Sequence, residues 1–149
     1  MAEDDVPMLA ICGLYPLFGR FFKTHGDTER LIGNVLSISK EFGEIHGYEN
    51  HSGQTFLGPG VKPLAEVRKG EGNNAKDNFE GARYRNIVAS YLHGSLLPKN
   101  PAIADFLIKA AVIRKYGSFE PVRRRRRTWR SWRSYRSWPG STPGSGRGR

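Results

Sequence analysis

Residues 8–19, with the sequence MLAICGLYPLFG, join the first apolar run of the chain to its first glycine. The run begins at Val6, ends at Cys12 and is short, continuous and largely aliphatic. Strands that are buried on both faces of a parallel sheet have this pattern. Beyond the glycine, residues 17–23 could begin a helix, although Pro16 keeps the preceding residue out of the helical region. The segment therefore predicts an α/β fold whose parallel sheet contains this strand.

The rest of the chain alternates short apolar runs with turn signals. Residues 100–114 have the clearest helix pattern, because Asn100 can cap the N-terminus, Pro101 suits the first helical position, and the apolar side chains have helical spacing. Residues 69–81 are rich in glycine and asparagine and predict a loop. We expect strands over residues 31–38, 43–51, 54–57, 63–68 and 82–92, with a Ser-Gly turn joining the second to the third.

The charge of the chain is concentrated at its C-terminal end. The 149 residues carry a formal net charge of +10, but ten arginines and no acidic residue follow Glu120. The first 121 residues are therefore neutral overall, and all three tryptophans also lie in the later segment. We interpret residues 1–121 as a domain and residues 122–149 as a disordered tail rich in Arg, Trp, Ser and Gly.

Composition also indicates a compartment. A single cysteine excludes an internal disulfide and fits a reducing environment. No apolar run approaches the roughly 20 residues that span a bilayer, and the acidic N-terminus does not resemble a secretory signal. We expect a cytoplasmic protein.

Two predicted strands end in residues that could take part in catalysis, Cys12 before Gly13 and His93 before Gly94. A cysteine nucleophile needs a base or a positive neighbour to hold it as the thiolate. Because the carboxyl ends of parallel strands meet at one crevice, the two side chains could lie together. A lone cysteine on an apolar strand is, however, more often a packing residue. On these residues alone, both interpretations stay open.

The other histidines do not predict a metal site. His46 and His51 lie five residues apart in an expected hairpin, His25 lies in a polar segment, and no second cysteine could complete a zinc site. The glycines near residue 70 do not follow a strand and lack the lysine of a phosphate-binding loop. We therefore expect no cofactor.

Eight motifs resemble, in order along the chain, those of a known family. They are LAICG at 9–13, ERLIGN at 29–34, FGEIHGYENH at 42–51, TFLG at 55–58, GEGNN at 70–74, EG at 80–81, YLHG at 91–94 and LPKN at 97–100. The family is the class I glutamine amidotransferase subunit of lipid II isoglutaminyl synthase, a relative of the cobyric acid synthase glutaminase domain. The resemblance covers residues 6–117. It implies a flavodoxin-like α/β domain of which the N-terminal part is missing here.

The resemblance assigns a role to three residues. Cys12 corresponds to the nucleophile that forms a glutamyl thioester, and His93 to its general base. Arg30 corresponds to the arginine that holds the glutamine α-carboxylate, a task suited to a planar, bidentate donor. Without the family, Arg30 reads as a solvated loop charge. Ser95 stands where the broader class often has a glutamate, consistent with a Cys-His dyad.

The resemblance also implies an activity and partners. The subunit would hydrolyse glutamine and pass ammonia to a Mur-ligase-like, ATP-dependent partner subunit in a heterodimer. That partner would amidate the D-glutamate of the lipid II stem peptide in peptidoglycan synthesis; a corrinoid precursor is the other possible acceptor. No nucleic acid is expected as a partner.

Departures from the family pattern define an alternative. Leu14 and Pro16 replace a glycine and a glutamine after the nucleophile, and the family has a substantial segment ahead of this strand. The alternative is a catalytically inactive, truncated homologue that acts only by interaction, or a frame-shifted fragment without function. For residues 122–149 we weigh binding to RNA or to an anionic membrane, a solvated extension, and out-of-frame translation of GC-rich DNA, and we favour the last.

Overall fold

The computed structural model of the chain describes residues 2–14 and 22–121. Contacts divide the chain into one unit over Met1–Phe119 and a second over Glu120–Arg149. The predicted tail, residues 122–149, lies outside the described residues, as do residues 15–21. The possible helix at residues 17–23 falls mostly in that gap, but its last two residues belong to a strand, so that part of the prediction is wrong.

The predicted first strand is part of a small sheet. Strand β1 (Met8–Ile11) pairs in parallel with β7 (Ile87–Ser90), as its apolar run predicts, and β7 pairs with β6 (Ala82–Tyr84) in antiparallel orientation. The predicted single strand over residues 82–92 is wrong. A two-residue turn with Arg85 at a φ of 47° splits it into a hairpin, and the chain then enters the other sheet at β8 (Leu92–His93).

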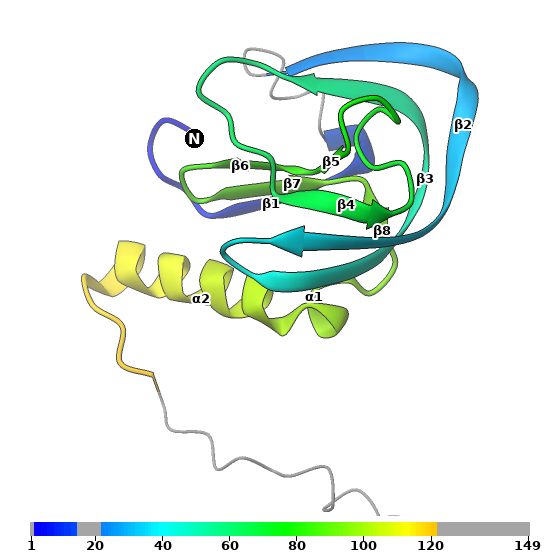
Figure 1. Ribbon diagram of the computed structural model, residues 1–149. Coiled ribbons are helices and arrows are strands. Elements are labelled where there is room, and N and C mark those ends of the chain that lie inside the picture. Colours follow the sequence, from blue (N-terminus) through cyan, green and yellow to red (C-terminus); the bar gives the residue numbers. More distant parts are fainter. Residues whose placement is uncertain (1, 15–21, 122–149) are drawn as a thin grey trace, which may run out of the picture. The chain divides into compact units, whose positions relative to one another are not determined.

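The second sheet has five strands in the order β5-β4-β2-β3-β8, and all its neighbours are antiparallel. Its long strands are β2 (Phe22–Ser39) and β3 (Gly43–Leu57), which run side by side in Figure 1. Strands β4 (Ala65–Lys69) and β5 (Phe79–Glu80) complete one edge. The predicted Ser-Gly turn is wrong, because Gly53 pairs with Gly26 inside one continuous β3. The expected open parallel sheet is thus replaced by a mainly antiparallel arrangement.

The predicted helix is confirmed as α2 (Pro101–Tyr116), which follows the single turn α1 (Leu96–Lys99). Asn100 occupies the predicted N-cap position of α2, but its side chain makes no cap hydrogen bond, so that part of the prediction is wrong. Its amide instead spans to β3: Nδ2 donates to the His46 carbonyl at 2.9 Å, and Oδ1 accepts from the His46 N–H at 2.8 Å. The start of α2 is therefore fixed to the sheet. None of the helices in the described residues is long and apolar enough to cross a membrane.

The apolar core joins the two sheets and the helices. Its buried members come from every layer and are Val35, Ile45, Leu64, Ala65, Val88, Leu92, Leu96 and Ile103. A second cluster contains Ala10, Ala82, Ala89 and Tyr91, and Cys12 packs against it. The predicted loop at 69–81 is held by the buried carboxylate of Glu49, which accepts the N–H groups of Glu71 and Gly72 at 3.0 and 2.8 Å. This loop is confirmed apart from Lys69, which ends β4, and the short strand β5.

Candidate active site

Cys12 occupies a sharp turn directly after β1. Its φ is 52°, in the left-handed region that residues other than glycine rarely adopt, and it begins a short turn of 3₁₀ helix at residues 12–14. The side chain is half-buried and the thiol is free. A strained residue at a strand end is the geometry that exposes a nucleophile above a sheet. The backbone at Cys12 is therefore the kind found at functional sites.

Arg30 is displaced from the regular sheet by a β-bulge. The β2–β3 register shifts between Gly26 and Leu31, so that four residues of β2 lie opposite Ser52 alone. Bulges of this kind bend a strand and redirect a side chain. The exposed Arg30 uses its Nε to donate a hydrogen bond to Asn50 Oδ1 at 2.7 Å.

A pocket of about 200 Å³ brings these two features together. Its lining residues come from the turn after β1, the bulge of β2, the middle of β3 and the segment before β8; they are Cys12, Gly13, Arg30, Asn50, His51, Ser52, Gly53 and Tyr91. The volume suits a small ligand rather than one of drug size. Two of the three predicted site residues, Cys12 and Arg30, therefore line one pocket.

His93 lies on the neighbouring strand. It pairs with Tyr48 of β3, so its side chain shares a sheet face with Tyr48 and with Asn50, two residues further along β3. Its Nε2 is buried and has no hydrogen-bond partner. Among the described residues, it is not one that lines the pocket, and it shares no hydrogen bond with Cys12. Its role as the base stays a prediction.

A stacked ring pair forms one side of the pocket. The rings of His51 and Tyr91 lie 3.7 Å apart between centroids with 6° between their planes. His51 Nδ1 lies 2.7 Å from the Gly53 carbonyl, which can only accept, so this nitrogen carries the proton. Burial lowers the pKa of His51, and the Gly53 contact opposes that shift. His51 is therefore neutral near pH 7.

A buried acid lies behind the same segment. Glu80 Oε1 accepts the Ser90 hydroxyl at 2.6 Å and the Tyr91 N–H at 3.3 Å. Burial, assisted by the negative charge of Glu49, raises the pKa of Glu80 to about 7. These bonds fix the backbone where the chain passes from β7 toward β8.

Sequence reasoning left His51, Asn50 and Tyr91 without a role at the pocket. Their only signal was membership of the GYENH and YLHG motifs, which gives no position in space. Across the described parts of the chain, no group of three His, Cys, Asp or Glu side chains is arranged to hold a metal ion.

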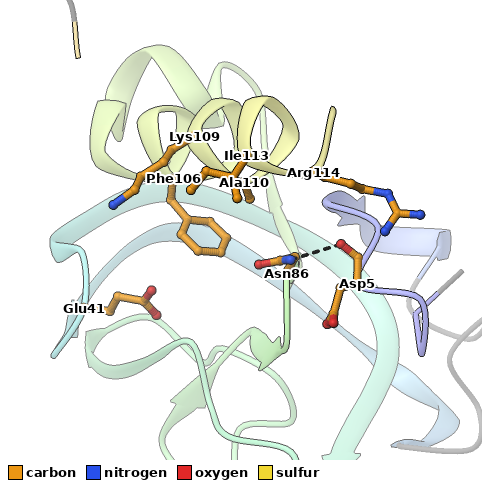
Figure 2. Close-up of a pocket in the computed structure, with 8 residues that line it drawn as sticks. All are labelled: Asp5, Glu41, Asn86, Phe106, Lys109, Ala110, Ile113 and Arg114. Carbon is orange, nitrogen blue, oxygen red and sulfur yellow. Dashed lines mark hydrogen bonds between the residues drawn. The ribbon is translucent and has the colours of Figure 1, made fainter. Parts of the chain in front are cut away.

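A larger pocket of about 590 Å³ lies beside α2 and has no lining residue in common with the Cys12 pocket. Figure 2 shows the Phe106 ring projecting from α2 into it, with Lys109 and Arg114 to either side. The Asn86 amide donates to the Asp5 carbonyl at 3.0 Å on its opposite wall. Its described lining residues include no cysteine, serine or threonine and none of the predicted site residues, so the smaller pocket is the candidate active site.

Residues 22–101 match the CobB/CobQ-like glutamine amidotransferase domain, which is more than half of the chain. The chain belongs to this family. The matched segment includes Arg30, His93 and the pocket residues of β3, and it begins after Cys12. The family membership confirms the predicted resemblance and the flavodoxin-like class I fold class, of which the described residues form a strand-rich, mainly antiparallel part.

Three relatives show how this amidotransferase domain compares with longer proteins. The "Lipid II isoglutaminyl synthase (glutamine-hydrolyzing) subunit GatD" of Staphylococcus aureus is 40% identical over 135 residues, covering 80% of this chain and 55% of the relative. The protein of the same name from Streptococcus pneumoniae is 34% identical, covering 77% and 51%. A "Probable cobyric acid synthase" of Methanosphaera stadtmanae is 28% identical, covering 62% and 24%. The chain thus spans about half the length of the first two relatives.

Proposed function

We propose that this amidotransferase domain hydrolyses glutamine to glutamate and ammonia. The observation that carries the proposal is the pocket shared by Cys12, in its left-handed turn, and the guanidinium of Arg30. Hydrolysis of an amino-acid amide needs at least a nucleophile for the amide and a cation that binds the carboxylate. The amidotransferase family gives this pair its substrate.

The reaction follows from a thiol and a base. His93 takes the Cys12 proton, and the thiolate attacks the γ-carboxamide carbon, forming a C–S bond. The C–N bond then breaks as the leaving nitrogen takes that proton, and ammonia is released. Water next attacks the thioester, the C–S bond breaks, glutamate is released and the Cys12 thiol is restored. Because the unliganded chain has no Cys12–His93 hydrogen bond, proton transfer requires a closer approach of the two in the substrate complex.

Arg30 supplies substrate selection. Its exposed guanidinium can hold the α-carboxylate through two parallel hydrogen bonds, which leaves the amide end of the substrate for Cys12. Arg30→Lys keeps the charge and loses the planar fork, so we expect a large rise in KM for glutamine with a smaller change in kcat.

We further propose that the ammonia serves a Mur-ligase-like, ATP-dependent partner subunit that amidates lipid II in the cytoplasm. The two relatives with a lipid II name are called subunits and are 40% and 34% identical over 80% and 77% of this chain. Cobyric acid synthases aligned over a similar share are 28% identical, and those at 40% and 42% identity align over less than half of the chain. A corrinoid acceptor is the competing assignment.

Glutamine turnover tests the catalytic proposal. Purified protein, alone and with a candidate ligase subunit and ATP, should release ammonia from glutamine, and Cys12→Ser should abolish the release. His93→Gln should lower kcat by at least about a hundredfold, the scale of lost general-base catalysis. His46→Gln is the matched control, because it changes an exposed histidine on β3.

Absence of turnover under both conditions would overturn the proposal and support the inactive, interaction-only alternative. Turnover that survives Cys12→Ser would refute the assigned nucleophile. Incorporation of ¹⁵N from amide-labelled glutamine into lipid II, rather than into a corrinoid, would decide the acceptor.

We also propose that residues 122–149 stand apart from the amidotransferase domain, because the family match ends at residue 101 and the net charge lies entirely in this segment. Deletion of these residues should leave glutamine turnover unchanged. A loss of turnover larger than the loss of folded protein would contradict this.

A further inference from the structure

The Arg30 guanidinium is held by a single side chain. Among the residues that the structure describes, only Asn50 hydrogen-bonds it, by accepting from Nε at 2.7 Å. An Nε bond fixes the plane of the guanidinium but leaves both terminal nitrogens available, and these are the donors that bind a carboxylate in parallel. The contact therefore orients the group without consuming its binding capacity.

The backbone dictates this pairing. Asn50 pairs with Ile32, so Arg30 lies two residues away on the neighbouring strand and on the same face, within diagonal reach. The bulge before Leu31 ends at Arg30 and turns its side chain toward the pocket that Asn50 also lines.

We propose that Asn50 is a positioning residue for glutamine hydrolysis, which orients Arg30 toward the substrate α-carboxylate and adds an amide donor to the same carboxylate. This inference rests on the proposed function. An asparagine performs both tasks because its oxygen accepts from Arg30 while its Nδ2 donates. An aspartate would retain the first contact and place a negative charge beside the substrate carboxylate.

Substrates that differ only in the carboxylate separate this role from a structural one. Glutamine and 4-aminobutanamide share the amide end, but the second lacks the α-carboxylate. Asn50→Ala should raise KM for glutamine about 10- to 100-fold, the scale of a lost hydrogen bond to a charged group, while kcat changes little. The same variant should leave kcat/KM for 4-aminobutanamide nearly unchanged. Asn50→Asp should also lower the preference for glutamine over 4-aminobutanamide, and this loss should be larger at low salt because the repulsion between the two carboxylates is less screened.

The matched control is Asn34→Ala, an exposed asparagine on the same face of β2. It should leave the preference for glutamine unchanged. A double-mutant cycle should show that the effects of Arg30→Ala and Asn50→Ala on this preference are not additive, because each removes the same oriented group. Circular dichroism melting of each variant would establish that it is folded.

Two failures can be told apart. If the wild-type protein releases no ammonia from either amide, the proposed function fails. If the wild-type protein is active and the folded Asn50 variants lower kcat/KM for both amides equally, or leave the preference for glutamine intact, the positioning role is refuted. Calorimetry with L-glutamate on the Cys12→Ser protein gives a readout without turnover: the role requires about tenfold weaker binding when Asn50→Ala is added.

Discussion

Glu80→Gln should change how the stability of this domain depends on pH. Glu80 is fully buried, and its burial, with the charge of Glu49, raises its pKa from 4.5 to about 7. Because the folded-state pKa lies above the unfolded value, folding takes up a proton between the two. The free energy of unfolding therefore falls as the pH rises from about 4.5 through about 7.

The size of this loss follows from the shift. A rise in the pKa from 4.5 to about 7 corresponds to about 3 kcal/mol of stability that is present at low pH and absent above about pH 7. Glutamine cannot ionise, and its oxygen can still accept from the Ser90 hydroxyl and the Tyr91 N–H. The variant should therefore lack this loss, and its stability should increase relative to that of the wild type as the pH rises.

Urea denaturation followed by circular dichroism at pH 5 and pH 8 measures the effect. The wild-type-minus-variant difference in the free energy of unfolding should change by about 2–3 kcal/mol between the two pH values, because part of the loss has already occurred at pH 5. His51, whose lowered pKa acts in the opposite direction, is common to both proteins and cancels. Glu71→Gln, at an exposed side chain, is the matched control and should run parallel to the wild type. Parallel curves for Glu80→Gln would refute the argument.

Two further substitutions test the packing that holds the site. Gly81→Ala should lower the free energy of unfolding by about 3 kcal/mol or more in urea denaturation, because its Cβ would lie 2.6 Å from a β7 carbonyl oxygen at a φ of 64°. Gly60→Ala, at a left-handed residue in open space, should lower it by about 1 kcal/mol, and equal losses would contradict the steric argument. Asn100→Ala should lower the free energy of unfolding by about 2–4 kcal/mol, because the buried amide links α2 to the His46 backbone. The control Asn34→Ala, at an exposed residue, should lower it by under about 0.5 kcal/mol, and equal melting temperatures for the two variants would contradict this prediction.

The elements that sequence predicted correctly are those with local causes. The helix after Asn100 was predictable because Pro101 and the apolar spacing act within one segment. The parallel pairing of β1 followed from its unbroken apolar run. The Asn100 side chain does not cap the helix, because its amide hydrogen-bonds the backbone N–H and carbonyl of a residue on a distant strand. The sequence alone contains no information on that partner.

The strand boundaries were predicted wrongly where they depend on pairing with a distant strand. Ser52-Gly53 is a good local turn signal, yet Gly53 pairs with Gly26 across the β2–β3 ladder and β3 continues through it. Arg85 gives no such signal, although it adopts a φ of 47° in the hairpin between β6 and β7. In both cases a non-local ladder of hydrogen bonds overrode the preference of the individual residue.

For the candidate site too, local features could be predicted from the sequence and non-local ones could not. Cys12 was predicted as a site residue because an apolar run that ends before a glycine is a local pattern in the sequence. Its pocket could not be found, because Asn50 reaches Arg30 only through the β2–β3 register and the bulge before Leu31. His93 was identified by its motif, and the structure adds its strand neighbour Tyr48 rather than a contact with the thiol.

Three departures from regular backbone meet around one pocket: the left-handed Cys12, the bulge that ends at Arg30, and the passage from β7 to β8 at Tyr91. Strained backbone such as that of Cys12 costs stability and persists only where the surroundings fix the conformation. Buried hydrogen bonds do so for the passage at Tyr91, where the Glu80 carboxylate accepts from the backbone. The stability of the site and its chemistry are therefore linked through the same residues. A variant that relaxes this support should lose glutamine turnover at a lower denaturant concentration than the one that unfolds the domain.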